Sequence, residues 1–306
     1  MMQAMSGIEW DAAQLAAWSE PRLARCEQAL SRWVGVNAPV LLGDAMRYAV
    51  LDGGKRLRPL LVLAASEAVD GHDEAALRAA CAAELIHAYS LVHDDLPCMD
   101  NDVLRRGKPT VHVQYGEADA LLAGDALQAL AFELLTPDDA GIAPVVQARL
   151  CRLLARAAGS EGMAGGQAID LASVGRVLDE ASLRQMHRLK TGALLQGSVE
   201  MGAGCAEQVP ADVLAALRDY GAALGLAFQV VDDILDVTAD SQTLGKTAGK
   251  DAASDKPTYV SLLGLDGARA EATRLLGDAL AALDRCPLTD TAALRALARM
   301  VVERDR

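Results

Sequence analysis

Four polar residues recur at helical spacing inside an apolar stretch in the last third of the chain. Gln229, Asp232, Asp233 and Asp236 stand at i, i+3, i+4 and i+7 within residues 223–237, where most neighbours are apolar. This spacing predicts one polar stripe on a largely buried helix. Three carboxylates on such a stripe repel one another and are costly to desolvate, and a bound cation removes that cost. This group, the 232–236 cluster, therefore suits Mg²⁺, which shares its ligands with substrate phosphates.

A second group of carboxylates, the 94–100 cluster, lies earlier in the chain beside another apolar run. Glu84, His87 and Asp94 have the spacing of residues on one face of a helix. On a regular helix Asp100 would lie about 240° around the axis from Asp94. Pro97 stands between them, and because proline lacks a backbone donor it predicts a kink or bulge that brings Asp100 back beside Asp94. We therefore expect a second acidic wall for the same cations.

Basic residues in two short segments are suited to bind anions near these carboxylates. Arg105 and Arg106 follow the 94–100 cluster, and because adjacent side chains point in different directions they suit two different anions. Lys55 and Arg58 belong to residues 53–59, whose proline is typical of the first turn of a helix, where phosphate is favoured. The segment is no P-loop, because its spacing differs and no strand precedes it. Further polar groups, each alone typical of ordinary surface, follow at Lys190, Thr191, Lys246, Lys250 and Lys256.

The elements that must position these groups are helices. The sequence is 52% hydrophobic but only 3% aromatic, so its core must consist of Ala, Leu and Val, which favours closely packed helices. Apolar runs at helical spacing are separated by short joints rich in Gly, Pro and Asp, and no alternating strand pattern of useful length occurs. The small residues at 162–167 predict close helix packing that also forms a cavity wall. We therefore expect a single all-α domain over residues 1–306.

Charge and cysteine content exclude several classes of function. The formal net charge is -13, which argues against nucleic acid or an anionic membrane surface as the main partner. Six scattered cysteines form no Cys-x-x-Cys pair, as expected in a reducing compartment. The first residues lack the pattern of a signal or transit peptide, and no run of eighteen apolar residues occurs. These features predict a cytoplasmic protein without a membrane span.

Taken together, these residues closely resemble the trans-prenyl diphosphate synthase family, and within it the bacterial-type farnesyl diphosphate synthases. The resemblance covers almost the whole chain, and the order and joint presence of its motifs are highly specific. The motifs are residues 53–59, 94–100 with 105–107, 162–167, Lys190–Thr191, Phe228–Gln229, 232–236 and Lys246.

The resemblance implies an isoprenoid-synthase-type helical bundle around a deep central cavity, present as a homodimer. Catalytic residues would be Asp94, Asp95, Asp100, Arg105, Lys190, Asp232, Asp233, Asp236 and Lys246. More than one Mg²⁺ ion would be held by Asp94, Asp100 and Asp232. The allylic diphosphate would contact Arg105, Lys190, Thr191, Gln229, Lys246 and Lys256. Isopentenyl diphosphate would contact Lys55, Arg58, His87 and Arg106. The C-terminal residues 302–306 would help to close the site.

The implied reaction explains why such residues are needed. Ionisation of the allylic diphosphate builds charge on the leaving oxygens, which Mg²⁺ and basic side chains stabilise. The carbocation alkylates isopentenyl diphosphate, and a proton is then lost, so no side-chain nucleophile is required. Tyr89, followed by Ser90, precedes Asp94 by five residues and lies about 7.5 Å away along the helix axis. In this family an aromatic residue there is similar to the pattern that stops chain growth at farnesyl diphosphate.

Several alternatives stay open on the sequence alone. The product could be geranyl or geranylgeranyl diphosphate, and a non-catalytic partner subunit would share the same fold. A terpene cyclase would usually have Asn, Ser and Glu in its second metal motif and more aromatic residues in its pocket. A di-iron bundle needs a second Glu-x-x-His besides Glu84 and His87, which is missing. A metal phosphohydrolase built on His93 and Asp94 leaves the 232–236 cluster unexplained.

Overall fold

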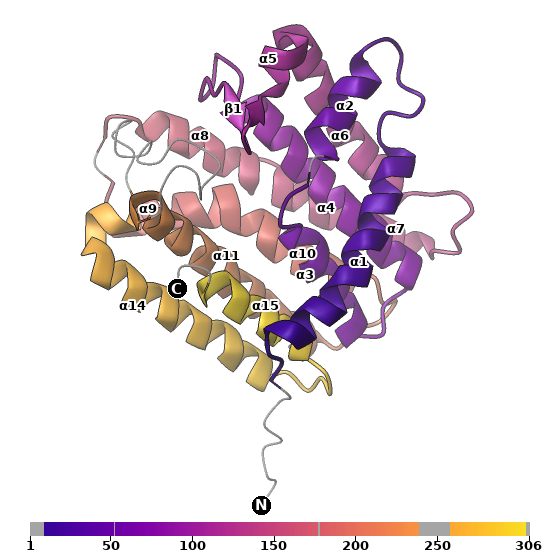
Figure 1. The fold of residues 1–306 in the computed structure, drawn as a ribbon. Coiled ribbons are helices and arrows are strands. Elements are labelled where there is room, and N and C mark those ends of the chain that lie inside the picture. The colour runs from indigo at the N-terminus through magenta and orange to yellow at the C-terminus, as the bar shows by residue number, and fades with distance from the viewer. Residues whose placement is uncertain (1–8, 52, 177, 239–257, 304–306) are drawn as a thin grey trace, which may run out of the picture.

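The computed structural model of the protein describes residues 9–51, 53–176, 178–238 and 258–303, which form a bundle of helices (Figure 1). The helices are α1 (Ala12–Trp33), α2 (Leu42–Val50), α3 (Leu57–Ala68), α4 (Asp73–Asp94), α5 (Val111–Tyr115), α6 (Glu117–Leu135), α7 (Pro144–Ala158), α8 (Met163–Ser173), α9 (Glu180–His187), α10 (Ala193–Gly204), α11 (Ala211–Thr238), α14 (Tyr259–Asp284) and α15 (Ala292–Val302). A π-helical turn, η1 (Arg188–Gly192), joins α9 to α10, and β1 (Leu104–Arg105) pairs with β2 (Lys108–Pro109). The all-α prediction is confirmed. Lys246, Lys250, Lys256 and the last three residues of the predicted closing tail lie outside the described residues.

Two central helices, α3 and α10, are apolar on nearly all sides, and other core elements therefore pack around them. Ten of the twelve residues of α3 and nine of the twelve of α10 are buried. The helices touch at Gly202, where a Cβ atom would lie 2.3 Å from the carbonyl oxygen of Val62, so only glycine fits. Both helices contribute to both hydrophobic clusters of the core. This sharing favours the predicted single domain, which stays a prediction.

The helix that carries Asp94, α4, begins at a capped N-terminus. The His72 imidazole accepts a hydrogen bond from the N–H of Ala75 at 3.3 Å. Asp73 and Glu74 add carboxylates to the first turn, where the helix dipole favours negative charge. The start of the helix is thus defined locally, while its other end is half-buried beside the cavity and leads into the 94–100 cluster.

By length and composition alone, α4 and α11 are apolar enough to cross a membrane. In α4, 72% of the apolar window is buried inside the protein, and in α11 56% is buried. Packing in the core therefore explains their composition, and such helices are weak evidence for a span. The absence of a membrane span and the cytoplasmic location stay predictions.

Candidate active site

A cavity of about 560 Å³ gathers residues from α3, α4, α8, η1, α11 and the β1–β2 region. Its polar lining consists of Arg58, His87, Ser90, His93, Asp94, Arg105, Arg106, Gln167, Lys190, Thr191 and Asp232. The remaining lining, mostly apolar, consists of Tyr89, Leu91, Met99, Met163, Ala164, Ala168, Leu171 and Phe228. Such a mixture suits a ligand with an anionic head and an apolar chain.

The chain turns sharply through the 94–100 cluster, because α4 ends at Asp94. The N–H of Asp100 donates to the carbonyl oxygen of Asp94 at 2.8 Å, and the N–H of Met99 donates to that of Leu96 at 2.8 Å. Asp100 therefore returns beside Asp94, as predicted. It does so through a helix end and a turn, however, and not through a kink inside a helix. Pro97 lies in this turn and cannot donate the hydrogen bond that a continuing helix would need.

The Asp94 carboxyl is partly buried close to like charge. Burial raises its pKa to about 6, the Lys190 ammonium opposes the rise, and the Asp100 carboxylate adds to it. At pH 7 Asp94 is therefore a carboxylate whose charge is poorly compensated by its surroundings. A divalent cation would supply that compensation.

Asp95 does not line the cavity but holds Arg105, which does. The buried carboxylate of Asp95 accepts hydrogen bonds from Nη2 of Arg105 at 2.6 Å and from its Nε at 2.8 Å. This bidentate pair fixes the guanidinium in the cavity wall. The geometry therefore favours a positioning role for Asp95, and its predicted place among the catalytic residues stays a prediction.

The β1–β2 hairpin explains why two adjacent arginines diverge. Arg106 (φ 53°) and Gly107 (φ 76°) both have left-handed backbone conformations, as in a type I′ turn. Arg105 pairs with Asp95, whereas Arg106 donates to the carbonyl oxygen of Gly53 in the loop before α3. Their different directions, which the sequence predicted, are confirmed.

The 232–236 cluster lies on α11, but its carboxylates have different surroundings. Asp232 lines the cavity. Asp233 is 2% exposed and accepts hydrogen bonds from the N–H of Tyr259 at 2.8 Å and the side chain of Gln229 at 2.9 Å, which ties α11 to the start of α14. Asp236 is buried and is not part of the lining. Adjacent residues of a helix point about 100° apart, so Asp232 can line the cavity while Asp233 points towards the start of α14.

Lys190 and Thr191 reach the cavity from η1, a type of turn that frequently occurs at functional sites. The hydroxyl of Thr191 donates to Oε1 of Gln229 at 2.7 Å, and Nζ of Lys190 donates to Oδ2 of Asp170 at 2.5 Å. Polar contacts therefore run from α8 through η1 to α11.

Sequence reasoning missed α8 as a source of polar groups. The expected close packing is present, since a Cβ at Gly166 would lie 2.0 Å from the backbone nitrogen of Lys190. In addition, Gln167 lines the cavity and Asp170 binds the ammonium of Lys190. The available signal was the i, i+3 spacing of these two polar residues after a run of small ones.

Arg58 and His87 form an electropositive part of the lining. Arg58 is 9% exposed, and its Nε has no hydrogen-bond partner within the described chain. Burial lowers the pKa of Arg58, while Glu84 and Asp232 act in the opposite direction. Burial also lowers the pKa of His87 well below its usual value, and Arg58 and Arg106 add to that effect. A buried, unpartnered guanidinium beside a neutral imidazole favours an anionic ligand.

The loop before α3 contains one predicted ligand and one residue that the sequence analysis did not single out. Lys55 is exposed and does not line the cavity, so its substrate contact stays a prediction. Arg56 is buried with φ 45°, and its guanidinium donates to Glu27 at 2.5 Å, Glu84 at 2.7 Å and the carbonyl oxygen of Val50 at 2.6 Å. This clamp fixes the loop at the start of α3.

Tyr89 and Ser90 both line the cavity from α4. The Tyr89 ring meets the His93 ring edge to face at 5.7 Å between centroids. His93 in turn packs on Gly124 of α6, where a Cβ would lie 2.0 Å from Nε2 of the imidazole. The hydroxyl of Ser90 donates to the carbonyl oxygen of His87 at 2.8 Å. Tyr89 is thus held in a tightly packed region. Its predicted role, to form the floor of the cavity and so stop growth of the prenyl chain, stays a prediction.

The cavity carboxylates Asp94 and Asp232 supply only part of the ligand set that a metal ion needs. Within the described residues, no group of three or more His, Cys, Asp or Glu side chains is arranged to hold a metal. Asp94 and Asp232 nevertheless line one cavity from two different helices. Mg²⁺ commonly takes one or two carboxylates and completes its shell with water and phosphate oxygens. The donor set therefore fits ions that a diphosphate ligand would share.

His187, at the end of α9, is buried near the polar contacts of η1. It is 6% exposed, and neither ring nitrogen has a hydrogen-bond partner in the described part of the chain. Burial lowers its pKa to about 4, Asp170 opposes this, and Lys190 adds to it. The Asp233 carboxylate lies 4.0 Å from Nε2, but it already accepts two hydrogen bonds, so burial dominates.

We expect His187 to make the protein less stable in mild acid. Between pH 7 and 5 the unfolded imidazole takes up a proton and the folded one does not, so its contribution to the free energy of unfolding falls by about 2 kcal/mol. Urea unfolding at pH 7 and pH 5 measures this fall. In His187→Gln the difference in the free energy of unfolding between the two pH values should be smaller by about 2 kcal/mol. An equal pH dependence in the two proteins would show that the folded imidazole titrates normally.

The fold and the cavity define a class of all-helical protein with a pocket, lined by Asp94 of α4 and Asp232 of α11, that suits an anionic, chain-bearing ligand. The polyprenyl synthetase family matches residues 39–294 of the chain, and the protein belongs to that family.

Individual relatives agree with this assignment. The probable farnesyl diphosphate synthase of Bradyrhizobium diazoefficiens is 52% identical over 268 residues, which cover 86% of this chain and 80% of the relative. The chloroplastic geranylgeranyl pyrophosphate synthase of Capsicum annuum is 47% identical over 279 residues, which cover 91% of this chain and 75% of the relative. A structure of geranyltransferase from Helicobacter pylori, complexed with magnesium and isoprenyl diphosphate, matches with a TM-score of 0.83 at 34% identity. The match covers 97% of this chain and 99% of that structure. The predicted family and fold are confirmed.

Proposed function

We propose that the protein is a prenyl diphosphate synthase that condenses isopentenyl diphosphate with dimethylallyl or geranyl diphosphate. The observation that carries this proposal is that Asp94 of α4 and Asp232 of α11 line one cavity together with Arg58 and Lys190. The charged part of that cavity suits diphosphate groups, and its apolar part suits a prenyl chain. The names of the relatives support the same class of activity.

In this proposal Asp94, Asp100 and Asp232 hold more than one Mg²⁺ ion, and magnesium in the Helicobacter pylori structure supports the choice of ion. When bound, the ions would stabilise the negative charge that develops on the leaving diphosphate. The protein's own contribution comes from groups that contact the allylic diphosphate directly. These groups are Arg105, Lys190, Thr191 and Gln229, together with Lys246 and Lys256.

Several contacts in the structure support these roles. Lys190 is held within reach of the cavity by Asp170, and Arg105 is held there by Asp95. Preorganised cations of this kind stabilise developing negative charge without the cost of reorienting solvent. Asp233, Asp236, Asp100 and Gln229 are not among the residues that line the cavity. Asp233 acts through the position of α11, because it accepts the N–H of Tyr259 at the start of α14.

Isopentenyl diphosphate occupies the electropositive part of the cavity. Arg58, His87 and Arg106 line it, and Lys55 approaches from the exposed loop. Because His87 is neutral at pH 7, it forms a hydrogen bond to the diphosphate without adding charge. The apolar lining excludes water from the carbocation, which alkylates the isopentenyl double bond. The proton released afterwards passes to the departing diphosphate.

Chain length gives a direct prediction. We expect Tyr89→Ala to make products longer than farnesyl diphosphate, because removing the ring opens the cavity towards His93 and α6. Chromatography and mass spectrometry of the dephosphorylated products measure the length. Ser90→Ala, which removes only a hydroxyl from the next lining position, serves as the matched control. Farnesyl diphosphate as the sole product of Tyr89→Ala would rule out a floor at this position.

The proposed homodimer rests on an exposed apolar surface. Val113 of α5 and Leu121 and Leu122 of α6 are 50%, 48% and 53% exposed. Side chains of this kind gathered on neighbouring helices favour contact with a second copy. Sedimentation of the purified chain tests this assembly.

The decisive experiment incubates the purified protein with isopentenyl and dimethylallyl diphosphates plus Mg²⁺ and identifies the prenyl product. Farnesyl diphosphate supports the proposal in full, and geranyl or geranylgeranyl diphosphate changes only the length. A cyclic hydrocarbon formed without isopentenyl diphosphate would identify a terpene cyclase. Activity that appears only with a second protein would identify a non-catalytic partner subunit.

A further inference from the structure

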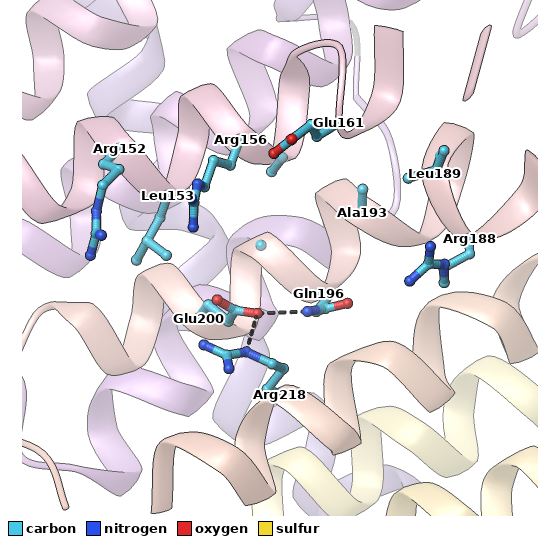
Figure 2. Close-up of a pocket in the computed structure, with 12 residues that line it drawn as sticks. Arg152, Leu153, Arg156, Glu161, Arg188, Leu189, Ala193, Gln196, Glu200 and Arg218 are labelled. Carbon is cyan, nitrogen blue, oxygen red and sulfur yellow. Dashed lines mark hydrogen bonds and ion pairs between the residues drawn. The ribbon is translucent and has the colours of Figure 1, made fainter. Parts of the chain in front are cut away.

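A second hollow of about 480 Å³ lies between α7, α10 and α11, next to η1 (Figure 2). Four arginines line this basic groove, namely Arg152 and Arg156 of α7, Arg188 of η1 and Arg218 of α11. Two glutamates, Glu161 and Glu200, also line it, so the groove has a formal excess of two positive charges. The whole chain carries a net charge of -13, and the positive charge is therefore a local concentration.

Most of this positive charge is not compensated by the protein. Arg218 pairs with Glu200 at 3.2 Å, and Glu200 also accepts a hydrogen bond from Gln196 at 2.6 Å, as the dashed lines in Figure 2 show. The three arginines of α7 and η1 make no side-chain hydrogen bond or ion pair with any other described residue. Figure 2 shows Arg152 and Arg156 of α7 on one side of the groove and Arg188 at its other end. Guanidinium groups that lack carboxylate partners in the described part of the chain are suited to bind phosphate oxygens.

The groove is separate from the reacting cavity, although η1 borders both. Arg188 lines the groove, whereas Lys190 and Thr191 line the cavity, and no residue lines the two hollows together. Adjacent turns of η1 and α8 are in tight contact at Gly166. A ligand in the groove would therefore touch the same short turn that positions Lys190.

We propose that the basic groove is a second binding site for a small phosphate-type anion, of which the diphosphate group is the best fit. The groove is large enough for a diphosphate, and its arginines are exposed and therefore accessible to a small anion. Its few apolar residues, among them Leu153 and Leu189, leave room for a short chain on the anion. The inference holds whether or not the reacting cavity performs the proposed condensation.

Protection from chemical modification tests the site residue by residue. Phenylglyoxal modifies exposed guanidiniums, and mass spectrometry of peptides locates each product. EDTA removes the divalent ions through which Asp94 and Asp232 would hold a diphosphate, so only metal-independent binding remains, and locating each product separates Arg58 and Arg106 of the reacting cavity from the arginines of the groove. Inorganic diphosphate should slow the modification of Arg152, Arg156 and Arg188 severalfold and leave the exposed Arg176 unaffected. Equal rates with and without diphosphate at the three groove arginines would overturn the proposal.

Calorimetry with inorganic diphosphate in EDTA at low ionic strength provides the second test. The triple variant Arg152→Gln, Arg156→Gln, Arg188→Gln should bind about tenfold more weakly or worse. A control triple variant, Arg32→Gln, Arg176→Gln, Arg269→Gln, removes the same charge from scattered exposed positions and should bind as the unmodified protein does. The cavity variant Arg58→Gln, Lys190→Gln should retain the groove affinity.

The outcomes separate the sources of binding. Unchanged affinity in the groove variant, or an equal loss in the scattered control, overturns the site. If only the cavity variant loses affinity for diphosphate, the binding belongs to the reacting cavity, and the proposed groove site is equally overturned. Repeating the titration with geranyl diphosphate distinguishes the ligand's source, since tighter binding indicates a prenylated head group and equal binding indicates the free anion.

Discussion

Asp232→Asn is expected to lower the turnover number by about 10²–10³-fold, because weaker binding of Mg²⁺ would remove part of the stabilisation of the charge that develops on the leaving diphosphate. Asp232 is the member of its cluster that lines the cavity, and an amide supplies no negative charge to a cation there. The concentration of Mg²⁺ needed for half-maximal activity should rise as well. Steady-state kinetics with varied Mg²⁺ measure both quantities, and complete removal of divalent metal should abolish turnover of the unmodified protein.

The neighbouring substitution Asp233→Asn is the matched control. It makes the same chemical change one residue along α11, but this carboxylate accepts the Tyr259 N–H and the Gln229 amide and does not line the cavity. We expect mainly lower stability, by about 1–3 kcal/mol, with a smaller loss of turnover and an unchanged Mg²⁺ requirement. If both variants lost turnover equally, or if Asp232→Asn kept full activity, the cavity would not be the reacting site.

Arg58→Met is expected to have opposite effects on activity and stability. The Michaelis constant for isopentenyl diphosphate should rise about 100-fold, because a charge-assisted contact to the diphosphate is lost. The free energy of unfolding should increase by about 1 kcal/mol or more, because a buried charge without a partner in the described chain is replaced by an apolar group of similar length. Kinetics and urea unfolding measure the two effects.

Arg56→Met provides the contrast, two residues earlier in the same loop. Its guanidinium is paired with Glu27 and Glu84, and removing it leaves the buried Glu84 carboxylate uncompensated. We expect a loss of about 3–5 kcal/mol in the free energy of unfolding. If Arg58→Met destabilised the protein as much as Arg56→Met does, Arg58 would be a structural residue and its assignment to the substrate would fail.

These predictions share one physical basis. Two of the groups proposed to bind ligand, Asp94 and Arg58, are poorly satisfied by the described part of the chain, as the raised pKa of Asp94 and the unpartnered Nε of Arg58 show. The groups proposed to position them, such as Asp95 and Arg56, have complete sets of partners. A stabilising substitution that abolishes activity is therefore expected at the first kind of residue, and not at the second.

The sequence by itself determined the helical class, the two acidic clusters and most of the residues that line the cavity. The helical class and the acidic clusters rest on local properties, because helical periodicity and a proline after Asp94 act through neighbours in the chain, whereas the roles of residues such as Lys190 and Thr191 followed from the resemblance to a known family. The return of Asp100 to Asp94 was predictable for that reason. The turn that achieves it, instead of a kink, depended on where α4 ends.

Only the tertiary structure decided which polar groups face the cavity. Asp232 lines it while Asp233 holds Tyr259, and Arg56 is neutralised by residues 28 and 29 positions away in the chain. The pairing of Lys190 with Asp170, and the groove arginines that pair with no other described residue, were likewise not visible in the sequence. The direction of a side chain on a buried helix depends on the elements packed around it, and that packing involves contacts between segments far apart in the chain.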